Sequence, residues 1–424
     1  MSVQEPVVSM SQAPKKPSVW FYLKQVGPGM LVAGAFIGTG TITSVSVAGT
    51  NYGYALLWAA VTVATFLTII LQEMSARLAL ATGQPLATTI RQRLGLLPAI
   101  IAILAIAFGN AIYSVGNENG VALSLGALFP SVPKVFWMVL VTFLYWLLLM
   151  TGRYNLYEKF ITGIVALMGV AFIIDLLVVK PEVGAIIKGL IVPIIPQGSM
   201  MVVLALIGTT VVPYNLFLQS AAVIERGWHK DPVGNLTLMR IDTIFSIIIG
   251  GIVTGAVAIV AAAILHPLHI SQGLEIKSAA DIALTLKPLL GQAAFAFFCI
   301  GLLGAAVSSM PMASLSAAYV VSQSFGWPND LRDWRFRAVF TVVAWVPVFF
   351  AAVTKNPIWT IIFAQSVNGI ILPVAAAFVL YLVNKREVAG QLRNNTLQNI
   401  LGFIAVGTAV WLGLRMILTS LGVI

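Results

Sequence analysis

The chain has 424 residues, of which 59% are hydrophobic and only 9% are charged, and its mean hydropathy is +0.97. This composition is far too apolar for a water-soluble globular protein and is typical of a polytopic membrane protein. The formal net charge is +10, and the only cysteine is Cys299. A single cysteine excludes both an intrachain disulfide and a thiolate metal cluster.

Residues 1–17 are polar, contain proline and have no apolar segment ahead of a cleavage site, so we expect a short disordered cytoplasmic tail. Residues 18–424 are expected to form a single transmembrane domain. Apolar stretches long enough to cross a bilayer predict an all-α protein with about 11 transmembrane helices. They cover approximately residues 27–50, 54–78, 97–129, 135–150, 160–179, 199–219, 242–265, 290–321, 338–354, 358–383 and 400–418.

Basic residues divide unevenly between the two sets of alternating connections. Short cytoplasmic loops are enriched in lysine and arginine. The connections that are poor in basic residues carry only Lys134, Lys180, Lys188, Lys277, Lys287 and Lys355. We therefore expect a multi-pass protein of the plasma (inner) membrane, with its N-terminus in the cytoplasm and its C-terminus outside. This topology accounts for the positive net charge without a nucleic-acid partner.

Two of the predicted spans are interrupted by glycine and hydroxyl residues. The sequence Ile-Gly-Thr occurs at 37–39 in the first span and again at 207–209 in the sixth. Backbone groups freed inside a bilayer must be buried in protein or line a cavity, and in transporters such breaks hold substrate and coupling ion. The matched breaks predict an inverted repeat, with one half at about 27–179, the other at about 199–383, and an extra helix at about 400–418.

Three stretches of the sequence together resemble one known family. They are Gly-Pro-Gly-Met at 27–30, Leu-Gln-Glu-Met-Ser-Ala-Arg at 71–77, and Pro-Tyr-Asn-Leu-Phe-Leu-Gln-Ser-Ala at 213–221. The chain resembles the natural resistance-associated macrophage protein (NRAMP) family of divalent-metal transporters. The resemblance implies the five-plus-five fold of amino-acid and neurotransmitter symporters, with broken helices one and six and alternating access around a midplane site.

The residues that carry the metal in that family are replaced in this chain. Its Asp-Pro-Gly-Asn motif corresponds here to residues 38–41, Gly-Thr-Gly-Thr, and its Met-Pro-His-Asn motif to residues 212–215, Val-Pro-Tyr-Asn. A second family histidine corresponds to Gln219, and acidic residues of span three correspond to Ser114 and Asn117. The chain is therefore similar to a divergent NRAMP-related branch that lacks the metal motif, for which bicarbonate uptake is the implied role.

The breaks offer neutral hydroxyls and backbone N–H groups but no carboxylate. A divalent hard cation normally requires carboxylate ligands, whereas helix N-termini favour anions. We therefore expect a small monovalent oxyanion, because no lysine or arginine is present for a larger one. The predicted contacts are Thr39, Gly40, Thr41, Thr209 and Thr210, with Tyr214 and Asn215 shaping the far side of the cavity.

Uptake of an anion into a negative cell interior costs about 2.3 kcal/mol per charge at 100 mV, so a coupled cation is expected. In symporters of this fold, sodium is held by carbonyls before the first break and by hydroxyls on span eight. Matching that pattern gives the carbonyls of Gly34 and Ile37 and the hydroxyls of Ser308 and Ser309. Further polar residues that we place along the path are Asn117, Glu118, Gln365 and Asn368.

The sequence as a whole predicts a sodium-coupled symporter for a small oxyanion, most simply bicarbonate, with no cofactor other than Na⁺ and no transition-metal site. The expected partners are the anion, sodium and the lipid bilayer, and a monomer should suffice for transport. One alternative is an NRAMP-type transporter of Mg²⁺ or Mn²⁺, which requires Glu118 to reach the site. Another is a non-transporting membrane sensor. An enzyme is not expected, because the chain has no catalytic motif near either break.

Overall fold

The computed structural model of the chain describes residues 38–151 and 154–421, and these residues form helices and connections without a β-strand. The first half contains α3 (Thr39–Tyr52), a 3₁₀ turn (Gly53–Leu56), a π-helical turn (Trp58–Val63), α4 (Ala64–Thr82), α5 (Leu86–Leu94), α6 (Leu96–Leu128), α7 (Lys134–Met150), α8 (Tyr154–Val179) and α9 (Val183–Ile191). The second half contains α10 (Met200–Thr210), α11 (Pro213–Glu225), α12 (Leu236–Gln272), α13 (Ala279–Ala283), α14 (Lys287–Leu290), α15 (Ala294–Phe325), α16 (Trp334–Ala352), α17 (Pro357–Asn384), α18 (Arg386–Ala389) and α19 (Thr396–Ser420). Short 3₁₀ turns lie at Trp228–Lys230, Leu284–Leu286, Gly291–Ala293 and Gly390–Leu392.

Long apolar helices dominate the described part of the chain and confirm the all-α membrane architecture. Nine helical segments there are long and apolar enough to cross a bilayer, and α7 is a shorter apolar helix. The predicted first span begins outside the described residues, so the count of about 11 spans stays a prediction. The same holds for the tail at residues 1–17 and for the boundaries of the two repeats.

The surface around the bundle is apolar in the way that contact with lipid requires. Large apolar side chains are exposed on α6, α8, α16 and α19, with Leu104, Leu177, Phe349 and Phe403 as examples. In water such a surface would be costly, whereas lipid tails are as apolar as these side chains. The bundle is therefore suited to a bilayer rather than to an aqueous surrounding.

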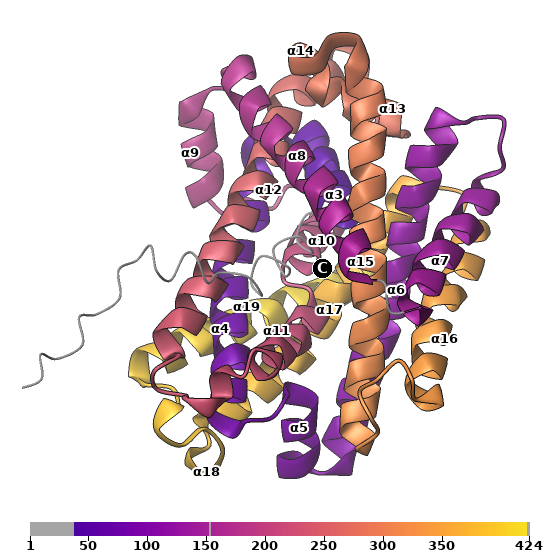
Figure 1. The fold of residues 1–424 in the computed structure, drawn as a ribbon. Coiled ribbons are helices and arrows are strands. Elements are labelled where there is room, and N and C mark those ends of the chain that lie inside the picture. The colour runs from indigo at the N-terminus through magenta and orange to yellow at the C-terminus, as the bar shows by residue number, and fades with distance from the viewer. Residues whose placement is uncertain (1–37, 152–153, 422–424) are drawn as a thin grey trace, which may run out of the picture.

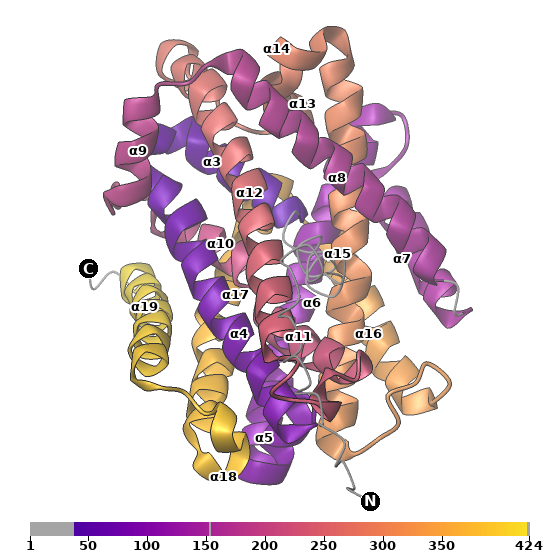
Figure 2. The same ribbon diagram turned by 60° about the vertical axis from the view of Figure 1, so that its left-hand side comes forward.

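The two ends of the bundle are distinct. Helices α5 and α18 lie at one end, and α13 and α14 lie at the other (Figures 1 and 2). The end with α5 and α18 carries Arg91, Arg93 and Arg386, whereas Lys277 and Lys287 belong to the opposite end. The arginine-rich end is the one predicted to face the cytoplasm; the orientation itself stays a prediction.

Helices α10 and α11 together form one span that is broken in the middle. Eleven residues precede the break and thirteen follow it, and the break consists of Val211 and Val212. Pro213 stands at the first position of α11, where its missing N–H costs little, and it favours an extended residue before it. Val212 is extended, with φ −65° and ψ 124°, so the proline ends α10 and restarts the span as α11.

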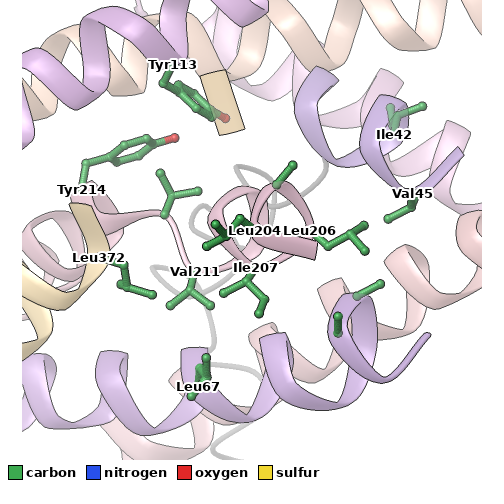
Figure 3. Close-up of a cluster of buried hydrophobic side chains, with 14 of the residues drawn as sticks. Ile42, Val45, Leu67, Tyr113, Leu204, Leu206, Ile207, Val211, Tyr214 and Leu372 are labelled. Carbon is green, nitrogen blue, oxygen red and sulfur yellow. The ribbon is translucent and has the colours of Figure 1, made fainter. Parts of the chain in front are cut away.

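Apolar side chains shield this break. Ile207 and Val211 lie at the connection between α10 and α11, and Leu67 of α4 and Leu372 of α17 pack around it (Figure 3). All of these side chains are buried. The irregular backbone is thereby kept inside protein, as a bilayer requires.

Close packing between α10 and α17 depends on Gly208. A Cβ at this position would lie 2.1 Å from the carbonyl oxygen of Gln365 and 2.5 Å from the backbone nitrogen of Gly369. Small residues allow membrane helices to approach to this distance. The glycine of the second Ile-Gly-Thr sequence therefore sets the position of α10 against α17.

We expect Gly208→Ala to destabilise the protein by about 1–3 kcal/mol, because the methyl group overlaps backbone atoms that cannot rotate away. Thermal unfolding of the purified protein in detergent measures the effect as a lowered melting temperature. Gly407→Ala in α19 is the matched control, since no atom lies within 4 Å of its added Cβ. Equal melting temperatures for the two variants would contradict the packing role of Gly208.

Candidate functional site

The start of α3 and the end of α10 meet inside the bundle. The side-chain oxygens of Thr41 and Thr209 lie 3.0 Å apart in a buried hydrogen bond. The two residues are 168 positions apart in the sequence. The structure therefore places the residues that follow the first Ile-Gly-Thr sequence in direct contact with the second.

Helices α6 and α17 enclose this contact from two further sides. A Cβ at Gly120 of α6 would lie 2.3 Å from the methyl carbon of Thr39, so the threonine packs directly on this glycine. A Cβ at Gly40 would lie 2.2 Å from the amide carbon and nitrogen of Gln365, and one at Gly116 would lie 3.5 Å from the same nitrogen. Three glycines thus make room for the side chains of Thr39 and Gln365 between α3, α6 and α17.

A tyrosine pair forms a second part of the site. The rings of Tyr113 in α6 and Tyr214 in α11 meet edge to face with their centroids 5.6 Å apart (Figure 3). The hydroxyl of Tyr113 faces the side chains of Tyr214, Asn117 and Ser309, which bring α11, α6 and α15 together. Polar groups from three helices therefore converge beside the break in the second half.

Several polar side chains at this junction are buried without a hydrogen-bond partner among the described residues. They are the hydroxyl of Thr39, both amide atoms of Gln365, both amide atoms of Asn215 and the amide nitrogen of Asn368. A buried polar group without a partner costs about 1–3 kcal/mol, so native proteins seldom keep several together. Their concentration here fits a polar ligand or water that supplies the missing partners.

The junction contains no carboxylate among the residues that the structure describes. The neighbouring acid on α6 is Glu118, and it accepts a 2.5 Å hydrogen bond from the hydroxyl of Thr142 on α7. Across residues 38–151 and 154–421 no group of three or more His, Cys, Asp or Glu side chains is placed to hold a metal ion. The site as described is therefore polar and neutral.

Most of the predicted anion contacts lie at or beside this junction. Thr39, Gly40, Thr41 and Thr209 lie where α3 and α10 meet, and Asn215 follows in the first turn of α11. Their role in binding stays a prediction, because proximity alone does not establish it. The hydroxyl of Thr210 donates to the carbonyl of Leu206 within its own helix.

Two of the polar residues predicted along the path, Gln365 and Asn368, lie on α17 and face α3 and α6. Gln365 lies against Gly40, and the side-chain amide oxygen of Asn368 would lie 3.6 Å from a Cβ at Gly109 of α6. Gln219, which corresponds to a family histidine, donates to the hydroxyl of Thr243. Gln219 is therefore held by a neighbour on α12.

Only half of the predicted sodium site can be placed. Gly34 and Ile37 lie outside the described residues. The hydroxyl of Ser308 donates to the carbonyl of Ala305 in its own helix, and Ser309 is buried beside Tyr113. The sodium site stays a prediction.

The sequence did not single out Tyr113 or the glycines at 116 and 120. Tyr113 stands four residues before Asn117, a spacing that places both on one face of a helix. A polar ring at that spacing inside an apolar span was the available signal. The glycines are recognisable only from the side chains that pack on them.

Glu73, an acid in the predicted second span, belongs to a separate ion-pair network. Its carboxylate accepts from Arg77 at 3.0 Å and from Arg240 at 2.8 Å. The Arg77 side chain is 1% exposed and also donates to the carbonyl of Leu392 and to Asn394, each at 2.6 Å. This network joins α4, α12 and the segment before α19, so its role is to hold helices together.

We expect Glu73→Gln to lower the free energy of unfolding by about 3 kcal/mol, because the buried guanidinium of Arg77 loses its counter-charge. Glu275→Gln is the matched control: its ion pair with Lys277 is 3.0 Å long, but the side chains are 65% and 76% exposed. That variant should change stability by less than about 0.5 kcal/mol. Comparable losses in chemical unfolding of both variants would refute the structural role of Glu73.

Comparisons with known proteins agree with this architecture. A family model described as "Natural resistance-associated macrophage protein-like" matches residues 29–419. Proteins named divalent metal cation transporter MntH from Chromohalobacter salexigens and Aeromonas hydrophila are each 29% identical over 93% of this chain, covering 90% and 96% of their own lengths.

Two groups of solved structures share the fold. The manganese transporter of Eremococcus coleocola has a TM-score of 0.77 at 20% identity, covering 97% of this chain and 90% of its own. Mhp1, a nucleobase-cation-symport-1 family transporter, has a TM-score of 0.54 at 17% identity, covering 93% of both chains. At these identities the likeness concerns the fold.

Proposed function

The chain belongs to the natural resistance-associated macrophage protein family and is a multi-pass membrane transporter, and from this premise we propose that its cargo is a small monovalent oxyanion taken up with sodium. Bicarbonate is the leading candidate. The names of its relatives favour a divalent metal instead, and metal transport is the second candidate.

The observation that carries the anion proposal is the neutral donor set at the helix breaks. Thr39, Thr41, Thr209, Asn215 and Gln365 supply hydroxyl and amide groups and no negative charge. A divalent cation must be compensated for the loss of its hydration, and Mg²⁺ and Mn²⁺ sites normally do this with carboxylates. Neutral ligands alone compensate poorly for the hydration that a divalent ion loses on binding.

Helix ends at the site support a guest of negative sign. Both α3 and α11 begin at the junction, and a helix N-terminus carries about half a positive charge with unpaired N–H donors. The end of α10 offsets one of the two, because a helix C-terminus carries the opposite partial charge. The summed partial charge of the three helix ends is weakly positive, which suits a monovalent anion better than a multiply charged one.

The chemistry of bicarbonate matches groups that both donate and accept. Its two carboxylate-like oxygens accept hydrogen bonds, while its hydroxyl donates one. Threonine hydroxyls and the amides of Gln365 and Asn215 offer both functions. Sodium enters the proposal because anion uptake against a negative membrane potential needs a driving cation.

The metal alternative rests on the relatives' names and makes a structural demand. With Glu118 bonded to Thr142 on α7, a divalent ion at the breaks would be held by neutral oxygens and its own water. Metal transport would therefore require Glu118 to leave Thr142 and turn toward the junction. Separating the two candidates requires measurement of both cargoes in the same preparation.

Transport by the purified protein in liposomes tests the proposal. We expect labelled bicarbonate, supplied at alkaline pH, to accumulate only with an inward sodium gradient, and labelled Mn²⁺ not to accumulate. Protein-free liposomes provide the background for carbon dioxide diffusion. Manganese uptake without bicarbonate uptake would overturn the anion proposal and support the second candidate.

The site assignment predicts that Thr41→Asp reduces bicarbonate uptake more than about tenfold, because a fixed carboxylate repels the anion in a partly desolvated site. Thr41→Asn is the matched control, since it has nearly the same shape as aspartate without the charge. Its uptake should stay much closer to that of the wild type. Equal uptake by the two variants would show that the anion does not pass next to Thr41.

A further inference from the structure

A cavity of about 400 Å³ opens at the end of the bundle that carries α13, away from the α5 and α18 end. Its walls include Ala122, Leu123, Gly126 and Ala127 of α6, and its charged lining consists of Lys134, Lys277 and Lys355. Ser278 and Asn356 also line it. We call this cavity the lysine vestibule.

The charge of the vestibule is positive. No acidic side chain lines it, and Lys134 and Lys355 have no ion-pair partner within the described ranges. Lys277 is compensated, because its ammonium lies 3.0 Å from the carboxylate of Glu275. The carboxylate of Asp281 is close by and accepts the backbone N–H groups of Lys277 and Ser278. Three ammonium groups against two nearby carboxylates leave a net charge of +1, and the two lysines without an ion pair, Lys134 and Lys355, carry this excess.

The vestibule lies on the same two helices that enclose the candidate site. Along α6, Gly126 in the vestibule is about 9 Å from Gly120, on which Thr39 packs. Along α17, Pro357 in the vestibule is about 12 Å from Gln365, which packs on Gly40. The vestibule thus lies about two helical turns from the candidate site on both helices.

We propose that the lysine vestibule binds small oxyanions and concentrates them at the mouth of a path to the candidate site. A cleft lined by charge of one sign focuses the electric field and raises the local concentration of the oppositely charged solute. The same charges repel divalent cations. Anion binding in the vestibule is inferred from its lysines alone. The further statement that this anion is also the cargo rests on the proposed function.

The double variant Lys134→Gln/Lys355→Gln tests the vestibule. Lys188→Gln/Lys287→Gln is the matched control, because it removes two exposed lysines that do not line the cavity. Both variants and the wild type are placed in liposomes of zwitterionic lipid, so that no anionic headgroup competes. Initial rates of labelled bicarbonate uptake are then measured at low and at high ionic strength.

At low ionic strength we expect the vestibule variant to need at least about three times more bicarbonate for half-maximal uptake, with an unchanged maximal rate. The difference should shrink at high ionic strength, because salt screens exposed charges over about 10 Å at 0.1 M. The control variant should behave like the wild type. If both variants needed the same bicarbonate concentration for half-maximal uptake at low ionic strength, the proposal would be overturned.

A binding measurement separates failure of this inference from failure of the proposed function. Purified wild type and control variant in detergent should broaden the ¹³C resonance of labelled bicarbonate, and the vestibule variant should broaden it less. This readout does not require transport. Broadening that depends on the two lysines without bicarbonate transport would support the vestibule and reject the cargo; equal broadening by all three proteins would reject the vestibule.

Discussion

The structure depends on one constraint: a helix interrupted within a membrane must find partners for its backbone inside the protein. The break at Val211 and Val212 is enclosed by apolar side chains of α4, α10 and α17, and Gly208 lets α10 rest directly on the backbone of α17. The hydrogen bond between Thr41 and Thr209 then ties the start of α3 to the end of α10. A polar junction is the consequence, because the same packing that hides the break also gathers hydroxyls and amides that have few partners.

Fold and chemistry carry different information about this family member. The fold is shared with manganese transporters, but it specifies where a cargo binds rather than which cargo binds. Which cargo can bind depends on the groups at the junction, and the described groups there are hydroxyls, amides and helix ends. The nearby carboxylate of Glu118 is bonded to Thr142 on α7. The absence of a carboxylate at the described junction is the reason that we propose an anion, whereas the names of the relatives favour a divalent metal.

Apolar runs in the sequence predicted the ends of a helix closely when the helix is about as long as the bilayer is thick. The span predicted at 358–383 corresponds to α17, Pro357–Asn384. The span predicted at 242–265 falls short of α12, Leu236–Gln272, because that helix continues into polar ends with Arg240 and His269 that hydropathy does not count. Glycine and threonine in apolar surroundings predicted a break in the sixth span at 208–210, whereas the break lies just after them, at Val211 and Val212, because Pro213 ends α10. The break predicted in the first span begins outside the described residues and stays a prediction. The sequence did not indicate Tyr113 or the vestibule, since these depend on contacts between helices far apart in the chain.

The central claim is that the junction of the broken helices has no place for a divalent metal. Anomalous diffraction from crystals soaked in Mn²⁺ tests it most directly, because it locates manganese independently of any transport assay. The account predicts no anomalous peak between Thr41, Thr209 and Gln365. A well-occupied peak there, within bonding distance of side-chain oxygens, would contradict it.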